Sequence, residues 1–128
     1  GCQMVFDAIE KAWGGELFVP KIPSYKIVDV ASAIGPDCVQ EEVGIRPGEK
    51  LHEEMITVSD APNTYDIGKY YIILPQKTIF QREKFIKHFN AKLVDSNFSY
   101  NSGDNEEWES IESLRKLVKI HVDPKFNV

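Results

Sequence analysis

The two ends of the chain carry apolar residues at helical spacing. In residues 1–13 these positions fall on one face of a predicted helix, which a pair of glycines ends. Near the other end, Ser110 can cap a final helix whose apolar positions share one side. A shorter helix is predicted over residues 28–34, before a Gly-Pro pair. The apolar positions are Val5, Phe6, Ile9 and Trp13 in the first helix, and Ile111, Leu114, Leu117 and Val118 in the last.

Short apolar runs between these helices predict strands. The segment ELFVP (residues 16–20) is closed by a proline, and two prolines then keep the next residues extended. The segment QEEVGI (residues 40–45) is also predicted to be a strand. The apolar run YYIILP (residues 70–75) predicts a buried or edge strand that a further proline ends.

The remaining segments are less regular. The run EKLHEEMI (residues 49–56) predicts a helix, and the turn formers of residues 59–69 predict a loop. Residues 78–89 form either a helix or a loop with an apolar face, and residues 95–107 are predicted to be irregular. The inward positions of the helix over residues 49–56 are expected to be Leu51, Met55 and Ile56.

Together these elements predict a small α+β fold with few short strands and three to four helices. Its 128 residues suffice for one domain with a modest core, so we expect a single domain over residues 1–128. Residues 95–128 would form its tail, with the final helix.

Composition narrows the function classes. A net charge of −5 and no basic run argue against nucleic-acid binding. The longest apolar stretch, Tyr70–Leu74, is too short to span a bilayer, and no signal-peptide pattern precedes it, so we expect a cytoplasmic protein away from membranes. Cys2 and Cys38 follow no pairing pattern, which favours two reduced thiols over a disulfide.

The stretch VGIRPGEKLHEEMI contains the strongest candidate for a binding site. Pro47 fixes one backbone angle and Gly48 permits a positive φ, so the chain can turn tightly between Arg46 and Glu49. The guanidinium fork suits phosphate oxygens, and a carboxylate can accept bonds from the two hydroxyls of a ribose. The alternative is a surface turn in which the arginine and the glutamate pair with each other.

Other chemistry has weaker support. A His-Glu pair begins at His52, but a zinc-protease helix needs a second histidine at position 56, which is Ile56. The chain has no G-x-S-x-G, no G-x-G-x-x-G and no Walker A motif. We therefore expect no metal site and no catalytic residues in this chain.

Three segments together resemble a known family: GGELFVPKIPSYKIVDVASAI, VGIRPGEKLHEEMI and FSYNSGDNEEWESIESLRKLV. In this order they resemble the C-terminal part of inverting UDP-N-acetylglucosamine 4,6-dehydratases, extended short-chain dehydrogenase/reductases that serve bacterial surface-glycan synthesis. In that family a Rossmann domain holds NADP and the catalytic tyrosine and lysine, and a smaller C-terminal part closes over the UDP-sugar. The resemblance implies that this chain corresponds to the second part.

The resemblance also assigns residues. Arg46 would contact the pyrophosphate and Glu49 the uridine ribose. The segment with Phe18, Val19, Pro20 and Lys21 would lie beside the uracil and ribose, partly through backbone groups, and Lys21 and Ser24 would help to hold the nucleotide. The expected function is UDP-sugar binding without catalysis by this chain alone, and NADP would belong to the full-length family.

An alternative class is a protein-interaction or self-associating module derived from a dehydratase. The helix over residues 1–13 would normally be covered by the Rossmann domain, so its apolar face would be left exposed here. Such a face calls for a partner, either a second copy in a homodimer or a separate Rossmann domain.

Overall fold

A computed structural model describes residues 2–76 and 81–128 of the chain. They form two compact units, each built from two separate stretches of sequence. Unit 1 contains residues 2–21 and 54–101, apart from 77–80, and unit 2 contains Ile22–Glu53 and Ser102–Val128. Helices and short strands are mixed in the chain, so the predicted α+β class is confirmed.

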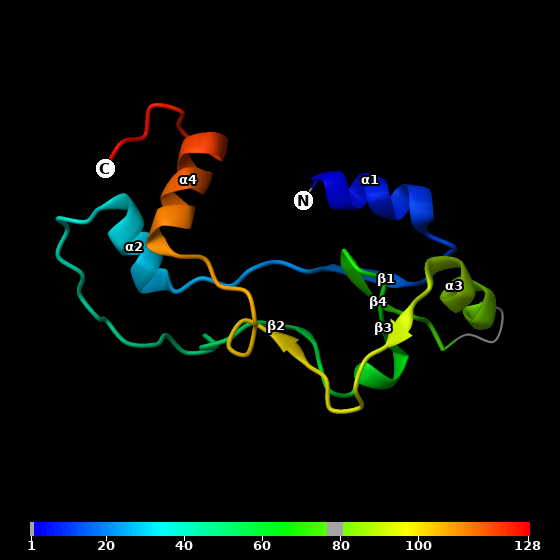
Figure 1. The fold of residues 1–128 in the computed structure, drawn as a ribbon. Coiled ribbons are helices and arrows are strands. Elements are labelled where there is room, and N and C mark those ends of the chain that lie inside the picture. Colours follow the sequence, from blue (N-terminus) through cyan, green and yellow to red (C-terminus); the bar gives the residue numbers. More distant parts are fainter. Residues whose placement is uncertain (1, 77–80) are drawn as a thin grey trace. The chain divides into compact units, whose positions relative to one another are not determined.

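Unit 1 is built around a four-stranded antiparallel sheet of order β1-β4-β3-β5 (Figure 1). Its strands are β1 (Leu17–Pro20), β4 (Tyr70–Ile73), β3 (Thr64–Asp66) and β5 (Lys92–Leu93). The unit also contains helix α1 (Cys2–Lys11), the 3₁₀ turn η1 (Ala61–Asn63) and helix α3 (Arg82–Phe89). A second, two-stranded sheet pairs β2 (Glu54–Ile56) with β6 (Tyr100–Asn101).

The two faces of the four-stranded sheet bury different clusters, because side chains alternate along a strand. On one face the core packs against residues from α1 and α3, and its buried members are Tyr65, Tyr70, Ile72, Leu74 and Phe85. On the other face the core contains residues of β2 and β6, and its buried members are Val19, Ile56 and Tyr100. The sheet is thus covered on both sides within unit 1.

Unit 2 pairs helix α2 (Ile27–Ile34) with helix α4 (Ile111–His121). The side chain of Arg115 on α4 donates hydrogen bonds to the carbonyls of Ala33 (3.1 Å) and Ser32 (3.4 Å) at the end of α2. Helix α4 begins with a capping box, in which the Ser110 and Ser113 hydroxyls each accept a bond from the other residue's backbone N–H. The predicted cap of the final helix is therefore confirmed.

Most predicted elements are present. The first helix, the helix before Gly35, and the strands at residues 17–20 and 70–73 all form, and residues 82–89 adopt the helical alternative. Of the segment predicted as helix or loop, residues 78–80 lie outside the described part. The segment predicted as a loop over residues 59–69 instead contains η1 and β3, and the irregular segment before Ser110 contains β6.

Two predictions for the middle of the chain are wrong. Residues 49–56 form no helix, because their last three residues are strand β2. Leu51 and Met55, both predicted to point inward, are exposed, whereas Ile56 is fully buried as predicted. A strand prevails here because it pairs with β6 and buries Ile56 in the second cluster. Residues 40–45, predicted as a strand, form no regular element, and no described strand pairs with them.

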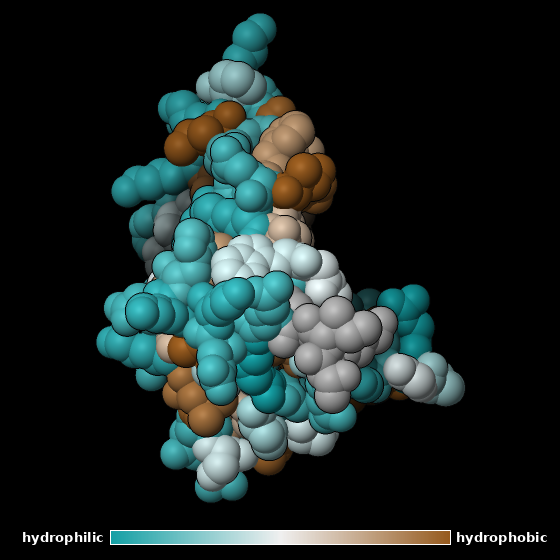
Figure 2. Space-filling model, turned by 90° about the vertical axis from the view of Figure 1, so that its right-hand side faces the viewer, coloured by the Kyte–Doolittle hydropathy of each residue, from teal (hydrophilic) through white to brown (hydrophobic). Residues whose placement is uncertain are grey.

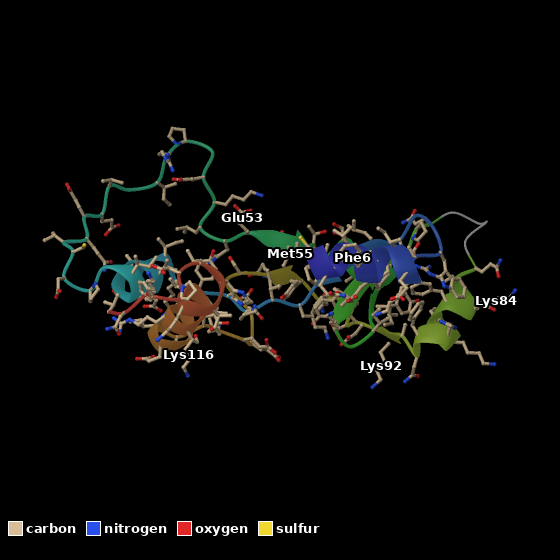
Figure 3. The ribbon with its side chains drawn as sticks, turned by 90° about the horizontal axis from the view of Figure 1, so that it is seen from above. Phe6, Glu53, Met55, Lys84, Lys92 and Lys116 are labelled. Atoms are coloured by element: carbon tan, nitrogen blue, oxygen red, sulfur yellow. The ribbon has the colours of Figure 1, made fainter. Side chains whose placement is uncertain are left out.

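Helix α1 packs on the first core cluster with the face that contains Met4 and Asp7. Met4 contacts the first core cluster and Asp7 is buried, whereas Val5, Phe6 and Ile9 are exposed. Figure 3 labels Phe6 on this helix. Figure 2 shows that apolar residues, in brown, also lie on the surface of the molecule in that view, among hydrophilic ones. The apolar face predicted for this helix is therefore largely open to solvent.

Candidate functional site

The turn from Arg46 to Glu49 has the geometry that its sequence predicts. Gly48 adopts a positive φ of 86°, and the Glu49 N–H donates to the Arg46 carbonyl at 3.1 Å, which closes a β-turn. A side chain at position 48 would be strained by this backbone conformation, so glycine is required.

Within this turn Arg46 and Glu49 pair with each other. The Arg46 Nε and Nη2 atoms donate to Oε1 of Glu49 at 3.1 and 2.8 Å, and the Arg46 backbone N–H donates to Oε2 at 2.8 Å. Backbone and side-chain hydrogen bonds from Arg46 lower the pKa of the Glu49 carboxyl. The Arg46 side chain is 85% exposed, so the pair stands in solvent. The predicted alternative of a self-paired surface turn is thus present in this structure, and the ligand role stays a prediction.

Strand β1 contains three predicted site residues in different environments. Val19 is buried in the second core cluster, whereas Phe18 packs against the first cluster with its ring 5.9 Å from that of Tyr70. The Lys21 N–H donates to the Lys69 carbonyl (3.5 Å), so Val19 and Lys21 direct backbone groups toward β4.

Phe18 and Pro20 alternate along the strand with Val19 and Lys21, so their backbone groups point away from β4. Since β1 is an edge strand of the described sheet, a proline can stand there without breaking a ladder bond. The Phe18 N–H and carbonyl lie side by side along this edge. Phe18 therefore has one backbone donor and one backbone acceptor on the outer edge of β1.

Lys21 is held at the end of β1 by two contacts. Its ammonium lies 2.7 Å from Oδ1 of Asp66 and 4.5 Å from the centre of the Tyr71 ring. Burial raises the pKa of Asp66, but hydrogen bonds from Lys21 and the Gly68 backbone, with the charges of Lys21 and Lys92, leave it below its ordinary value. A phosphate at Lys21 would therefore compete with an internal carboxylate.

Ser24 occupies a structural position in unit 2. Its N–H donates to the Glu107 carbonyl (2.8 Å), its carbonyl accepts from the Glu109 N–H (2.7 Å), and its hydroxyl accepts from the Asn105 side chain (3.1 Å). This bridge joins Ser24 to the segment before α4, and the residue is buried. The seven predicted site residues thus fall in both units: those of β1 and Lys21 in unit 1, and Ser24, Arg46 and Glu49 in unit 2.

A polar cluster around Asp7 in unit 1 has no counterpart among the predictions from the sequence. The Asp7 carboxylate accepts hydrogen bonds from Lys69 (2.7 Å), Tyr70 (2.6 Å) and Gln3 (2.8 Å). These bonds hold the pKa of Asp7 well below its usual range, and the bonds to Asp7 raise the pKa of Lys69 and of Tyr70. The cluster joins α1 to the start of β4. Local periodicity gave no signal for it because two of its three donors, Lys69 and Tyr70, lie more than 60 residues along the chain.

A Tyr-x-x-x-Lys spacing does occur in the chain, from Tyr65 to Lys69. Tyr65 lies on β3 in the core, and Lys69 precedes β4 and pairs with Asp7. The two residues therefore flank a strand-to-strand turn instead of sharing one face of a helix, as residues four apart on a helix do. The Lys69 ammonium instead contacts Asp7 and lies 5.3 Å from the centre of the Tyr70 ring.

Three further findings concern metal ligands, cysteines and membrane-spanning helices among the described residues. No group of three or more His, Cys, Asp or Glu side chains among them is placed to hold a metal ion. Cys2 and Cys38 are both free thiols. None of the helices in residues 2–76 and 81–128 has the length and apolar character needed to cross a membrane.

The sequence profile of the polysaccharide biosynthesis protein family matches residues 1–75. The chain belongs to this family. Two UDP-N-acetylglucosamine 4,6-dehydratases (inverting), from two strains of Campylobacter jejuni, are 40% and 38% identical to it over 122 and 123 residues. A solved structure, that of Pen from Bacillus thuringiensis, matches with a TM-score of 0.69 at 28% identity.

These relatives of the polysaccharide biosynthesis family are much longer than this chain. The aligned region is 92% of this chain but 36% of each dehydratase, and 91% of this chain but 34% of the Bacillus protein. The resemblance to the dehydratases is confirmed, and the chain spans about a third of their length.

Proposed function

We propose that this chain binds the nucleotide part of a UDP-sugar and performs no dehydration by itself. The observation that carries the proposal is the similarity to two named UDP-N-acetylglucosamine 4,6-dehydratases over 92% of the chain, including the segment with the Arg46–Glu49 turn. The cofactor turn of a Rossmann domain has no counterpart in the sequence. The catalytic part of the reaction would therefore have to come from elsewhere.

The geometry of each unit supports the proposal separately. In unit 2 the guanidinium of Arg46 is exposed, and exchange of Glu49 for a diphosphate would keep it paired with an anion. Glu49 would then be released to accept hydrogen bonds from ribose hydroxyls. In unit 1 the outward N–H and carbonyl of Phe18 match the alternating acceptor and donor along the imide edge of uracil.

The test is a calorimetric or NMR titration with UDP, and then with UDP-N-acetylglucosamine. We expect the wild type to bind and Arg46→Ala to bind about 10- to 150-fold more weakly, because a charge-assisted hydrogen bond contributes roughly 1.5–3 kcal/mol. Lys116→Ala is the control, since it also removes one exposed cation of unit 2, on α4 (Figure 3). Equal affinity of Arg46→Ala and the wild type would reject the assigned role, and so would equal losses in both variants.

A second candidate function is self-association through α1. Three large apolar side chains of this helix are exposed, and Ile9 is the most open of them at 74%. Exposed apolar patches of this kind often mark protein–protein contacts. The partner that binds the exposed face of α1 would be a second copy of the chain.

Light scattering checks the second candidate. We expect the wild type to form dimers at high concentration and Phe6→Asp to remain monomeric, because a buried charge at a new interface carries a large desolvation penalty. Leu93→Asp is the control, since it places the same charge at an exposed apolar position outside α1. A wild type that stays monomeric at all concentrations would reject self-association.

A further inference from the structure

Unit 1 contains a cavity that is lined by none of the seven residues predicted for the nucleotide site. Its volume is about 300 Å³, at the lower end of the range of small-molecule sites. It lies between the turn that joins β3 to β4 and the segment that joins α3 to β5. The lining residues, all of unit 1, are Asp66, Ile67, Gly68, Phe89, Asn90 and Lys92.

Two opposite charges line this cavity. Asp66 and Lys92 stand directly opposite each other in the antiparallel pair of β3 and β5. Residues in such a pair direct their side chains to the same face of the sheet. The ion pair of Asp66 is nevertheless with Lys21, at 2.7 Å. Within residues 2–76 and 81–128, the ammonium of Lys92 forms no hydrogen bond and no ion pair.

The other polar groups of the cavity also have unused hydrogen-bonding capacity. Oδ1 of Asp66 accepts bonds from the Lys21 ammonium and the Gly68 N–H, both at 2.7 Å, whereas Oδ2 accepts none from the described residues. Asn90 ends α3 in the left-handed conformation, with a φ of 48°. Its side-chain amide forms no hydrogen bond within the described ranges. A carboxylate oxygen, an amide and an ammonium can therefore all bind a ligand here.

The charges restrict the ligand that suits this cavity. A simple anion would be repelled by Asp66, and a simple cation would be repelled by Lys92 and Lys21. A molecule with both an ammonium and a carboxylate can instead pair with Asp66 and Lys92 at once. The rest of the wall is apolar, because Phe89 and Ile67 pack against the first core cluster. An apolar substituent would be stabilised there by burial.

We propose that this cavity binds a free α-amino acid with an apolar side chain. The ligand's ammonium would pair with Oδ2 of Asp66, and its carboxylate with the Lys92 ammonium and the Asn90 amide. Its side chain would pack against Phe89 and Ile67. An α-amino acid carries both charges on one carbon. This short separation suits two side chains at opposite positions of neighbouring strands, whose Cβ atoms are about 4.5–5.5 Å apart.

An NMR titration of the isotope-labelled full chain with L-leucine and with L-phenylalanine tests the proposal. We expect saturable shifts of the amide signals of Gly68, Asn90 and Lys92 at millimolar amino acid. Two analogues of leucine are the ligand controls: isoamylamine lacks the carboxylate and isocaproate lacks the ammonium. Each should bind at least about tenfold more weakly than leucine, because it loses one charge-assisted contact and leaves a protein charge unpaired.

Three variants connect the binding to the two charges. Lys92→Ala removes the partner of the ligand's carboxylate, and Asp66→Asn removes the opposite charge at nearly constant size. Both should weaken L-leucine binding about tenfold. Lys84→Ala is the matched control, since it removes another exposed lysine of unit 1, on α3 (Figure 3), and should not weaken binding.

Three results would each overturn the amino-acid site. They are unchanged amide signals with both amino acids, equal affinity for leucine and either analogue, and equal affinity of Lys92→Ala and Lys84→Ala for leucine. UDP is absent from this titration, so failure of the amino-acid site is distinguishable from failure of the nucleotide site.

Discussion

Phe85→Ala should reduce the free energy of unfolding of unit 1 by about 3–5 kcal/mol. Phe85 on α3 is completely buried and lies at the centre of an aromatic group. Its ring centre is 4.6 Å from that of Phe89 and 5.4 Å from that of Trp13, which meets it edge-on. Truncation removes these contacts together with those to the sheet, and leaves a cavity that the surrounding strands cannot fill.

Urea denaturation followed by circular dichroism checks this expectation. The midpoint should fall while the slope stays constant, because the same surface is exposed on unfolding. The matched control is Phe6→Ala, the same substitution at an exposed aromatic residue of α1, measured at a concentration where the chain is monomeric. Typical domains have only 5–15 kcal/mol of stability, so Phe85→Leu serves as a milder variant if Phe85→Ala does not fold. Equal midpoints for Phe85→Ala and the control would contradict the described core.

The elements that could be predicted are those whose signals are local. Helices α1, α2 and α4 follow from periodicity and from glycine or serine at their ends, and strand β4 follows from an apolar run before a proline. The Arg46–Glu49 turn is local too, because proline and glycine at its two central positions specify the backbone. Its geometry was therefore accessible from the sequence alone.

The elements that were missed depend on partners far along the chain. Strand β2 forms because β6 pairs with it, and the helical spacing of residues 49–56 gave no hint of that pairing. A strand needs a neighbour for its backbone groups, whereas a helix satisfies its own. The same difference explains why residues 40–45, with a strand-like composition, form no strand in the described structure.

The site residues show the same division. The pairing of Arg46 with Glu49 could be anticipated from their spacing, but the burial of Val19 and Ser24 could not. Burial of these two residues depends on contacts with β6 and with the segment before α4. The residue types alone therefore predict the turn. They do not show which candidate site residues are exposed to a ligand and which are buried by packing.

The orientation of α1 depends on Asp7, which the spacing of apolar residues in the sequence would place in solvent. Asp7 is buried, and three donors from α1 and the β3–β4 region converge on its carboxylate. A carboxylate with three donors is strongly favoured in its ionised form, and its pKa is accordingly held far below the ordinary value. The face of α1 that contains Met4 and Asp7 therefore packs on the core, while Val5, Phe6 and Ile9 remain exposed.

This cluster predicts that acid destabilises unit 1. The pKa of Asp7 is lower in the folded chain than in the unfolded chain, where it is about 3.9. The stability that ionised Asp7 contributes is therefore fully present above pH 4 to 5. It is lost as the pH falls below the pKa of Asp7 in the unfolded chain toward its lower pKa in the folded chain. Asp7→Asn removes the charge at nearly constant size, so this variant should be less stable than the wild type at pH 7 and should approach it near pH 2.

The measurement is a series of urea denaturation curves between pH 7 and pH 2. The wild-type midpoint should decline steeply on the acid side, and the midpoint of Asp7→Asn should decline much less. Tyr70→Phe, which removes one buried donor to the carboxylate, should fall between them, because Lys69 and Gln3 still stabilise the charge. Asp37→Asn, at an exposed aspartate of unit 2, should follow the wild-type curve. Parallel acid profiles for wild type and Asp7→Asn would show that this carboxylate does not bind α1 to the sheet, and the apolar side of the helix would then be free to turn inward.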